Sequence, residues 1–262
     1  MSFAVRLGGR LRSRSGPIAA SSYAERRLLT CGTDNTGQTG QHLLGHAVDP
    51  GADPDESRSI GPPTLVPSMQ GRRIVSVATS GLHCLALSRE GEVYSWGDGD
   101  FGSLGHADGG TRAVRSRIGS LSRVESIAAG DNWTSAAVNE DGKLFTWGRA
   151  TFINDETKPS GLGYALDSQT VFQLTPKCVV ALSEDRVVGV ALGLGFALAV
   201  TDAGAVFSFG YCRYRTLGHG SLEAEVLPRR IGALALTGRR FVAVAASASH
   251  ALALTEEGEL HG

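Results

Sequence analysis

A chain of 262 residues, 42% of them hydrophobic, is long enough to bury a substantial core, as one large β domain or two smaller ones. Its formal net charge of −1 excludes an overall electrostatic attraction to nucleic acid or anionic lipid. No apolar run reaches the roughly 18 residues that a membrane span requires, and 35 glycines beside only 9 prolines are typical of many tight turns.

The first residues of the chain differ in composition from the rest. Residues 1–24 carry four arginines and five serines, and the first acidic residue is Glu25. This composition is typical of a mitochondrial or plastid transit peptide, and a basic tail without a targeting role is the alternative. We therefore treat residues 1–27 as an N-terminal extension. We expect an intracellular protein, mitochondrial if this segment directs import and otherwise cytoplasmic or nuclear.

The next feature is a recurring aromatic–Gly pair with a second glycine nine residues after the aromatic. It reads CGTDNTGQTG (31–40), WGDGDFGSLG (96–105) and FGYCRYRTLG (209–218). A further copy, WGRATFINDETKPSGLG (147–163), needs sixteen residues, an insertion of seven (16 − 9). The repeated positions are Gly32, Trp96, Gly97, Gly105, Trp147, Gly148, Gly163, Phe209, Gly210 and Gly218. Such recurrence indicates a repeat architecture.

A run of small and hydrophobic residues is the second repeated feature, and a turn with an acidic residue and a glycine follows it. Aligning the four runs places at equivalent positions His83, Trp133, Phe196 and His250. Short β-branched and aromatic segments flank each glycine turn, as in LALSREGEVYSW (85–96), and predict β-hairpins. Each repeat is therefore expected to form short antiparallel strands, as a propeller blade does.

The patterns G-x-V-Y-S-W-G, G-x-L-G and A-A-G-x-x-H/W-T-x-A-L resemble the repeats of the regulator-of-chromosome-condensation family, over about residues 28–262. The resemblance implies a β-propeller, which has seven blades in that family. We expect an all-β fold, an RCC1-like β-propeller that is partial, with about four complete blades plus the start of a fifth. The predicted repeats cover residues 28–90, 91–141, 142–203 and 204–257, with a truncated fifth from residue 258.

The chain departs from the family pattern at several positions and in its number of repeats. Cys31 replaces the first aromatic residue, and Ser80 and Ser247 stand where the other runs have glycine. The family's ring closes by strands from both chain ends, which four repeats cannot achieve. Because an open stack exposes unpaired strand edges, we expect either a truncated form or a partner that covers the edge.

The sequence carries no recognisable catalytic motif, because G-x-S-x-G, the P-loop and H-E-x-x-H are all absent. Its four cysteines form no C-x-x-C pair, and we expect reduced thiols at Cys31, Cys84, Cys178 and Cys212. Structural roles inside blades are expected for the repeated histidines His83, His106, His219 and His250. We therefore predict no catalytic residue, no metal site and no cofactor.

Arginines recur just before the small-residue runs. They comprise the pairs Arg72–Arg73, Arg229–Arg230 and Arg239–Arg240, together with Arg112, Arg115 and Arg117. Gathered on one rim, they would suit a phosphate backbone or an acidic partner. Acidic residues balance them in number, so ordinary solvated loops are the alternative.

Two insertions, at residues 41–63 and 149–161, lengthen the repeats in which they lie. Loops on a rigid scaffold are where binding usually resides. In family members that exchange nucleotide on a small GTPase, a short insertion acts as a wedge, and the resemblance implies such a role here. The candidate partner-binding residues are Arg149, Phe152, Asn154, Asp155 and Lys158.

The function that we expect is a non-enzymatic protein-interaction scaffold, because repeat sheets offer wide surfaces. One alternative is a guanine-nucleotide exchange factor for a small GTPase, an activity that needs no catalytic side chain. The other is a mitochondrial RNA- or ribosome-associated factor, which would depend on the N-terminal segment and the arginines. The partner is thus a protein, with nucleic acid as the weaker option.

Overall fold

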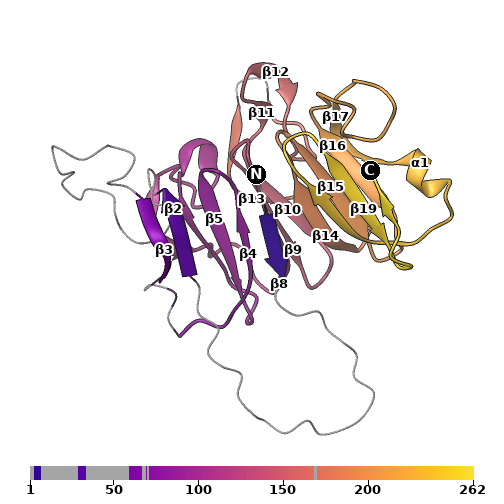
Figure 1. Cartoon of the computed structure of the whole chain (residues 1–262). Helices are drawn as coiled ribbons and strands as arrows, with labels where there is room; N and C mark the ends of the chain where they lie inside the picture. Colours follow the sequence, from indigo (N-terminus) through magenta and orange to yellow (C-terminus); the bar gives the residue numbers. More distant parts are fainter. Residues whose placement is uncertain (1–2, 7–28, 34–58, 67–68, 70, 168–169) are drawn as a thin grey trace, which may run out of the picture.

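The computed structural model describes residues 3–6, 29–33, 59–66, 69, 71–167 and 170–262. These residues form small antiparallel sheets that stand side by side along an arc (Figure 1). Helical elements are short: α1 (Gly232–Ala235) and the 3₁₀ turns η2 (Asp100–Gly102) and η3 (Val180–Leu182). In this described part, no helix is long and apolar enough to span a bilayer.

The sheets are propeller blades, and the first strand of each blade contacts the first strand of the next. Blade 1 contains β4 (Ile74–Thr79), β5 (His83–Ser88), β6 (Val93–Gly97) and β7 (Arg112–Arg117). Blade 2 contains β8 (Val124–Gly130), β9 (Thr134–Asn139), β10 (Leu144–Arg149) and β13 (Phe172–Cys178). Blade 3 contains β14 (Val187–Leu192), β15 (Phe196–Thr201), β16 (Val206–Gly210) and β17 (Glu225–Arg230). Blade 4 contains β18 (Phe241–Ala246), β19 (Ala251–Thr255) and β20 (Leu260–His261).

The predicted all-β, partial propeller is confirmed, but the blades are offset by half a repeat from the sequence repeats. Blade 2, for example, takes β8 and β9 from the repeat at 91–141 and β10 and β13 from the repeat at 142–203. The reason is that the glycine turn at each repeat boundary is a tight hairpin turn, and it pairs the strands on its two sides. Residues from 258 onward consequently supply the third strand of blade 4 rather than a new sheet.

Apolar side chains fill the space between successive blades. Leu85 and Val93 of blade 1 share one cluster with Trp147 of blade 2. Val206 of blade 3 and Phe241 of blade 4 share the corresponding cluster at the last junction. Because full burial of one such side chain contributes roughly 1.5–3 kcal/mol, these junctions supply most of the cohesion of the stack.

The N-terminal extension contributes one short strand to the fold. β1 (Phe3–Arg6) pairs antiparallel with β4, with Phe3 opposite Thr79 and Arg6 opposite Ser76. β2 (Leu29–Thr33) and β3 (Ser59–Leu65) form a separate pair. Residues 7–28 and 34–58 lie outside the described residues, so the transit-peptide prediction and most of the insertion at 41–63 remain predictions.

Candidate functional site

The insertion at residues 149–161 folds into a hairpin that rises from blade 2 at the top of Figure 1. Its strands, β11 (Thr151–Phe152) and β12 (Asp155–Pro159), pair antiparallel. The hairpin follows β10 of blade 2 directly, and its Phe152 contacts Tyr211 in a loop of blade 3. It contains all but one of the predicted partner-binding residues; Arg149 is the last residue of β10.

A buried asparagine fixes the base of the hairpin. The amide of Asn132, in the turn between β8 and β9, donates hydrogen bonds to the Thr151 carbonyl (2.8 Å) and to Ser160 Oγ (3.2 Å). Its side-chain oxygen accepts one from the N–H of Ile153 at 2.9 Å. Because Asn132 is fully buried, losing these bonds would leave polar groups unpaired, and the hairpin is held firmly in one place. Sequence reasoning missed this residue.

Phe152 anchors the hairpin to blade 3. Its side chain is buried, and its ring lies 4.6 Å from that of Tyr211, measured between centroids. A Cβ atom at Gly195 would come within 2.7 Å of the Phe152 ring, so only glycine allows this close approach. Phe152 therefore positions the hairpin and is not exposed for direct contact with a partner, which changes the role predicted for it.

Arg149 ties the hairpin to blade 1 and is also buried. Its guanidinium lies 4.2 Å from the centroid of the Phe101 ring and 6.0 Å from that of Trp133, both favourable cation–π distances. One terminal nitrogen lies 3.3 Å from Glu156 on β12, while Nε has no hydrogen-bond partner among the described residues. A buried charge compensated in this way holds its surroundings in place rather than facing solvent.

The tip and outer side of the hairpin are open to solvent. The exposed residues there are Ile153, Asn154, Glu156, Thr157 and Lys158. Asp155, half-buried, accepts hydrogen bonds from the side chain and backbone of Thr157, which lower the pKa of its carboxyl group. Of the five predicted contact residues, the structure thus leaves Asn154 and Lys158 exposed and turns the others inward to different degrees.

Trp133 occupies a different position from the one that the sequence alignment gave it. The pairing of the first with the second strand gives each blade the same register, in which the equivalent residues are Cys84, Ser135, Ala197 and Ala251. The residue that precedes Ser135 is Thr134. Thr134, and not Trp133, therefore corresponds to His83, Phe196 and His250. Trp133 is an additional residue in the turn, with φ of 54°. Its indole N–H donates to Asp98 at 3.1 Å, and its ring packs edge-on against Phe101.

Of the four repeated histidines, His83, His106 and His219 make hydrogen bonds inside the blades. His250 does not have the expected place inside a blade, because its side chain is exposed and its Nδ1 lies 3.2 Å from Oγ of the adjacent Ser249. His83 is fully buried; Nδ1 lies 3.0 Å from Ser80 Oγ, and Nε2 lies 2.8 Å from Ser135 Oγ. Since the Ser135 hydroxyl donates to the Ser103 carbonyl, Nε2 of a neutral His83 donates to Ser135. Burial lowers the pKa of His83 to about 4, and the charges of Asp98 and Asp131 oppose this shift.

A second hydrogen-bond motif explains why a Leu–Gly pair ends each of the repeated segments 96–105, 147–163 and 209–218. The hydroxyl of Ser95 donates to the Leu104 carbonyl and lies 2.8 Å from Nε2 of His106. Blade 3 repeats this arrangement with Ser208, Leu217 and His219, and blade 2 uses Thr146, Leu162 and Tyr164. His106 and His219 therefore take part in hydrogen bonds that hold the blade together, as predicted.

Comparison with known proteins places these repeats in a family. The sequence matches the regulator of chromosome condensation (RCC1) repeat at residues 90–137 and 203–254, and a second form of that repeat at residues 74–103. The chain belongs to the RCC1-repeat family. It is 31% identical to the ultraviolet-B receptor UVR8 of Arabidopsis thaliana over 97% of its own length. It is also 31% identical to the RCC1 domain-containing protein RUG3, mitochondrial, of the same plant over 95% of its length.

Among solved structures, Prp20p of Saccharomyces cerevisiae superposes on this RCC1-repeat chain with a TM-score of 0.66 and 26% identity, over 89% of the chain. Prp20p itself binds Gsp1p and histones. The chain spans little more than half of these relatives: 57% of UVR8, 56% of RUG3 and 53% of Prp20p. Its likeness to them therefore concerns the shared repeats.

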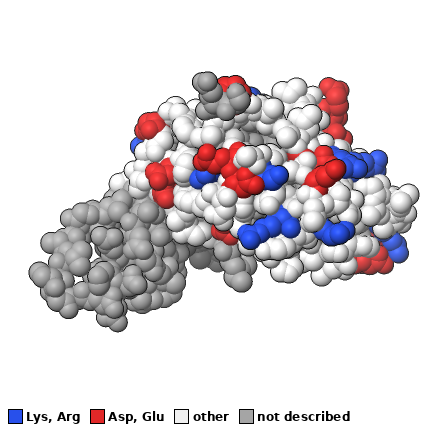
Figure 2. All heavy atoms as spheres, turned by 90° about the horizontal axis from the view of Figure 1, so that it is seen from above, with Lys and Arg blue, Asp and Glu red and all other residues white. Residues whose placement is uncertain are grey.

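Most of the recurring arginines of these RCC1 repeats are engaged in ion pairs. The pairs are Arg72–Glu92, Arg73–Glu90, Arg112–Asp108, Arg117–Glu92, Arg229–Glu225, Arg239–Glu259 and Arg240–Glu256. Arg115 lies over the ring of Tyr94. On the face that carries the hairpin, both signs of charge occur close together (Figure 2). The structure therefore favours the solvated-loop alternative over a basic rim.

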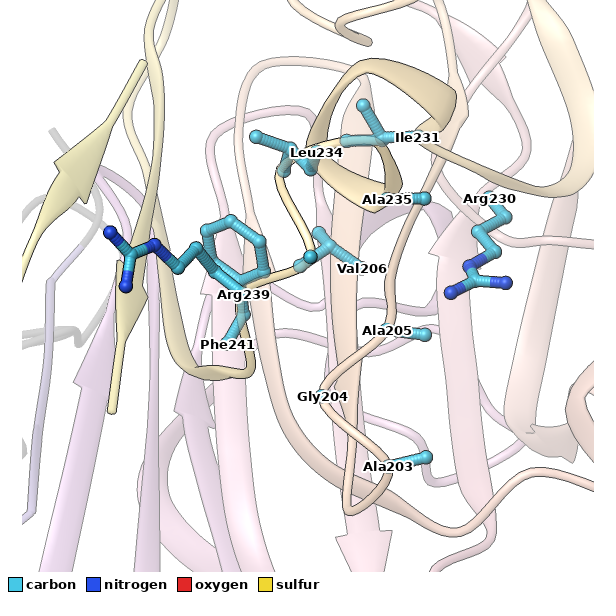
Figure 3. Close-up of a pocket in the computed structure, with 11 residues that line it drawn as sticks. Ala203, Gly204, Ala205, Val206, Arg230, Ile231, Leu234, Ala235, Arg239 and Phe241 are labelled. Carbon is cyan, nitrogen blue, oxygen red and sulfur yellow. The ribbon is translucent and has the colours of Figure 1, made fainter. Parts of the chain in front are cut away.

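A small pocket of about 180 Å³ lies at the junction of blades 3 and 4 (Figure 3). Leu234 and Phe241 line it, and the guanidinium groups of Arg230 and Arg239 point in different directions on its two sides. The equivalent leucines of the earlier junctions, Leu121 and Leu182, are fully buried. The loop around α1 is longer than its counterparts, and the pocket that it leaves has no converging polar side chains for a ligand.

Proposed function

We propose that this RCC1-repeat chain is a non-enzymatic scaffold that binds protein partners, with the hairpin β11–β12 as its principal contact. One observation carries the proposal: the hairpin is fixed at its base by Asn132, Phe152 and Arg149, while its tip is open to solvent. A contact element that is already ordered loses little conformational entropy on binding.

The neighbouring loop of blade 3 extends this surface. It begins at Tyr211, which packs on Phe152, and it exposes the side chains of Tyr214 and Leu222. Arg213 stacks over the Tyr214 ring at 5.1 Å. Aromatic residues and arginine are enriched in protein interfaces, so hairpin and loop together have the composition of a protein contact surface.

Co-purification with a matched pair of variants tests the proposal. The tip variant carries Ile153→Ala, Asn154→Ala and Lys158→Ala, and the control carries alanine at Leu236 and Thr237, which are exposed near α1. We expect a defined set of proteins to bind the wild type and the control and to be lost, at least tenfold, from the tip variant. Equal recovery of all proteins by the three forms would contradict the proposal.

Guanine-nucleotide exchange on a small GTPase is the second candidate, and the superposition on Prp20p favours it. The hairpin would bind the nucleotide-free GTPase more tightly than the loaded form, which shifts the equilibrium toward nucleotide release. The test is the release of fluorescent GDP from a panel of small GTPases. Faster GDP release with the wild type but not with the tip variant would support exchange activity. Unchanged GDP release with every GTPase of the panel would rule it out for these GTPases.

A mitochondrial location is a further proposal, supported by the composition of residues 1–24 and by the likeness to RUG3. A fluorescent fusion of residues 1–27 should enter mitochondria, and a cytosolic fusion would count against it. An RNA- or ribosome-associated role receives less support, because the arginines that it would need are neutralised by neighbouring carboxylates.

A further inference from the structure

The N-terminal strand β1 changes the edge of blade 1. In the part of the chain that the structure describes, the first strands of blades 2, 3 and 4 (β8, β14 and β18) each end their sheet. In blade 1, β1 is added outside the first strand β4, so that this sheet has five strands. Figure 1 shows β1 as the indigo arrow beside β4. Residues 3–6 therefore cover a strand edge that is open in the other described blades.

Pairing between distant parts of the chain holds β1 in this place. β1 runs antiparallel to β4 in continuous register, from Phe3 opposite Thr79 to Arg6 opposite Ser76. It also contacts β8, the first strand of blade 2. The paired residues are 70 to 76 positions apart in the sequence (76 − 6 and 79 − 3). The start of the chain is thus part of the folded propeller.

The direction of one backbone amide shows which hydrogen bonds join β1 to β4. The N–H of Ser80 donates to the carbonyl of His83, on the β5 side of the sheet. Because successive N–H groups of a strand point to opposite sides, the N–H of Val77, three positions earlier, points toward β1. Val77 lies opposite Val5, and a pair of this kind exchanges two hydrogen bonds. Removing the N–H of Val5 therefore removes one of the few bonds that hold β1.

The residues of β1 also belong to the segment whose composition is typical of a transit peptide. Such peptides are amphipathic and rich in arginine. Apolar residues and arginines each recur here every four positions, a spacing that forms a stripe along a helix. They are Phe3, Leu7 and Leu11, and Arg6, Arg10 and Arg14. Strand and helix need different backbone dihedrals, so residues 3–6 cannot pair with β4 and form a targeting helix at the same time.

We propose that β1 masks a mitochondrial targeting segment. While residues 3–6 pair with β4, the segment is held on the propeller, and the import machinery binds only chains in which β1 has been released. β1 has only four residues, so its release does not require the blades to unfold. The equilibrium between the two forms sets how much of the protein enters mitochondria and how much stays outside. This inference rests on the mitochondrial location proposed above and adds the contact that regulates it.

Import into isolated mitochondria tests the masking. The probes are the full chain and the fluorescent fusion of residues 1–27, each with valine, proline or isoleucine at position 5, and import is scored as protection from added protease. Val5→Pro removes the N–H that faces Val77 and disfavours a strand, whereas Val5→Ile keeps both features. Proline also acts on a helix. The quantity compared is therefore the import of the full chain divided by that of the fusion with the same residue 5.

We expect Val5→Pro to raise this ratio at least threefold and Val5→Ile to leave it unchanged. Hydrogen exchange of the purified full chain should be faster at Val77 in Val5→Pro than in the wild type, and equal in β15 of blade 3. A ratio that Val5→Pro does not change, or equal exchange at Val77, would overturn the masking and leave the mitochondrial location standing. Exclusion of every fusion from mitochondria would overturn both.

Discussion

Acidification should weaken the fold through His83, which is buried without a charged partner in hydrogen-bond contact. The ordinary histidine pKa is 6.5 and burial lowers that of His83 to about 4. Between these values the unfolded chain binds a proton that the folded chain excludes. The contribution of His83 to stability is therefore complete above pH 6.5 and is lost as the pH falls toward 4.

The size of the effect follows from the two pKa values. A pKa difference of about 2.5 units, at about 1.36 kcal/mol per unit, corresponds to about 3 kcal/mol of unfolding free energy lost by pH 4. This is a large fraction of the roughly 5–15 kcal/mol that stabilises a typical domain. Burial also lowers the pKa values of His106 and His219, which adds to the loss in the same direction.

The His83→Gln variant isolates the contribution of His83. Glutamine can donate to Ser135 and accept from Ser80 but does not titrate. Denaturant unfolding, followed by tryptophan fluorescence between pH 7 and pH 4, should give a shallower pH dependence for the variant than for the wild type, by about 3 kcal/mol over this range. Parallel curves for the two proteins would refute the assignment.

Three further predictions concern packing. Asn132→Ala should lower the free energy of unfolding by about 1–3 kcal/mol and speed hydrogen exchange in the hairpin β11–β12. Unchanged exchange would contradict the role of Asn132 in fixing the base of the hairpin. In denaturant unfolding, Leu198→Ala should lower the free energy of unfolding by about 2–5 kcal/mol, and Leu252→Ala by less than about 1 kcal/mol, because Leu198 is buried and Leu252 is not. Equal losses would contradict this difference in burial. Gly142→Ala should lower the melting temperature more than Gly71→Ala, since both have positive φ but only Gly142 touches the next blade; equal shifts would count against that contact.

The repeat architecture was accessible from the sequence because its landmarks have a direct structural cause. Each glycine turn needs a positive φ, and each x-L-G carbonyl accepts a hydrogen bond from the strand of the preceding aromatic residue. The half-repeat offset of the blades was not accessible, because a period gives the spacing of the elements but not which neighbours share a sheet. The alignment of Trp133 failed because an aromatic residue in a longer turn resembles the aromatic Phe196 of a strand.

The candidate site was located by its insertion, but the direction of its side chains was not predictable. Phe152 and Arg149 have the residue types of a contact surface, yet Tyr211 and Phe101, distant in sequence, bury them. Asn132 carries no motif; its only signal was the one-residue lengthening of its turn. Such roles depend on tertiary contacts between blades, which a single sequence does not reveal.

The central claim, that the hairpin tip is the partner contact, is tested most directly by site-specific photo-crosslinking. A photoreactive amino acid at Ile153, on the tip, would be compared with one at Val180, which is exposed on η3 of blade 2. The account predicts that a discrete protein is crosslinked in cells from position 153 and not from position 180. Crosslinks of equal yield and identity from both positions, or none from position 153 while a partner remains bound, would contradict it.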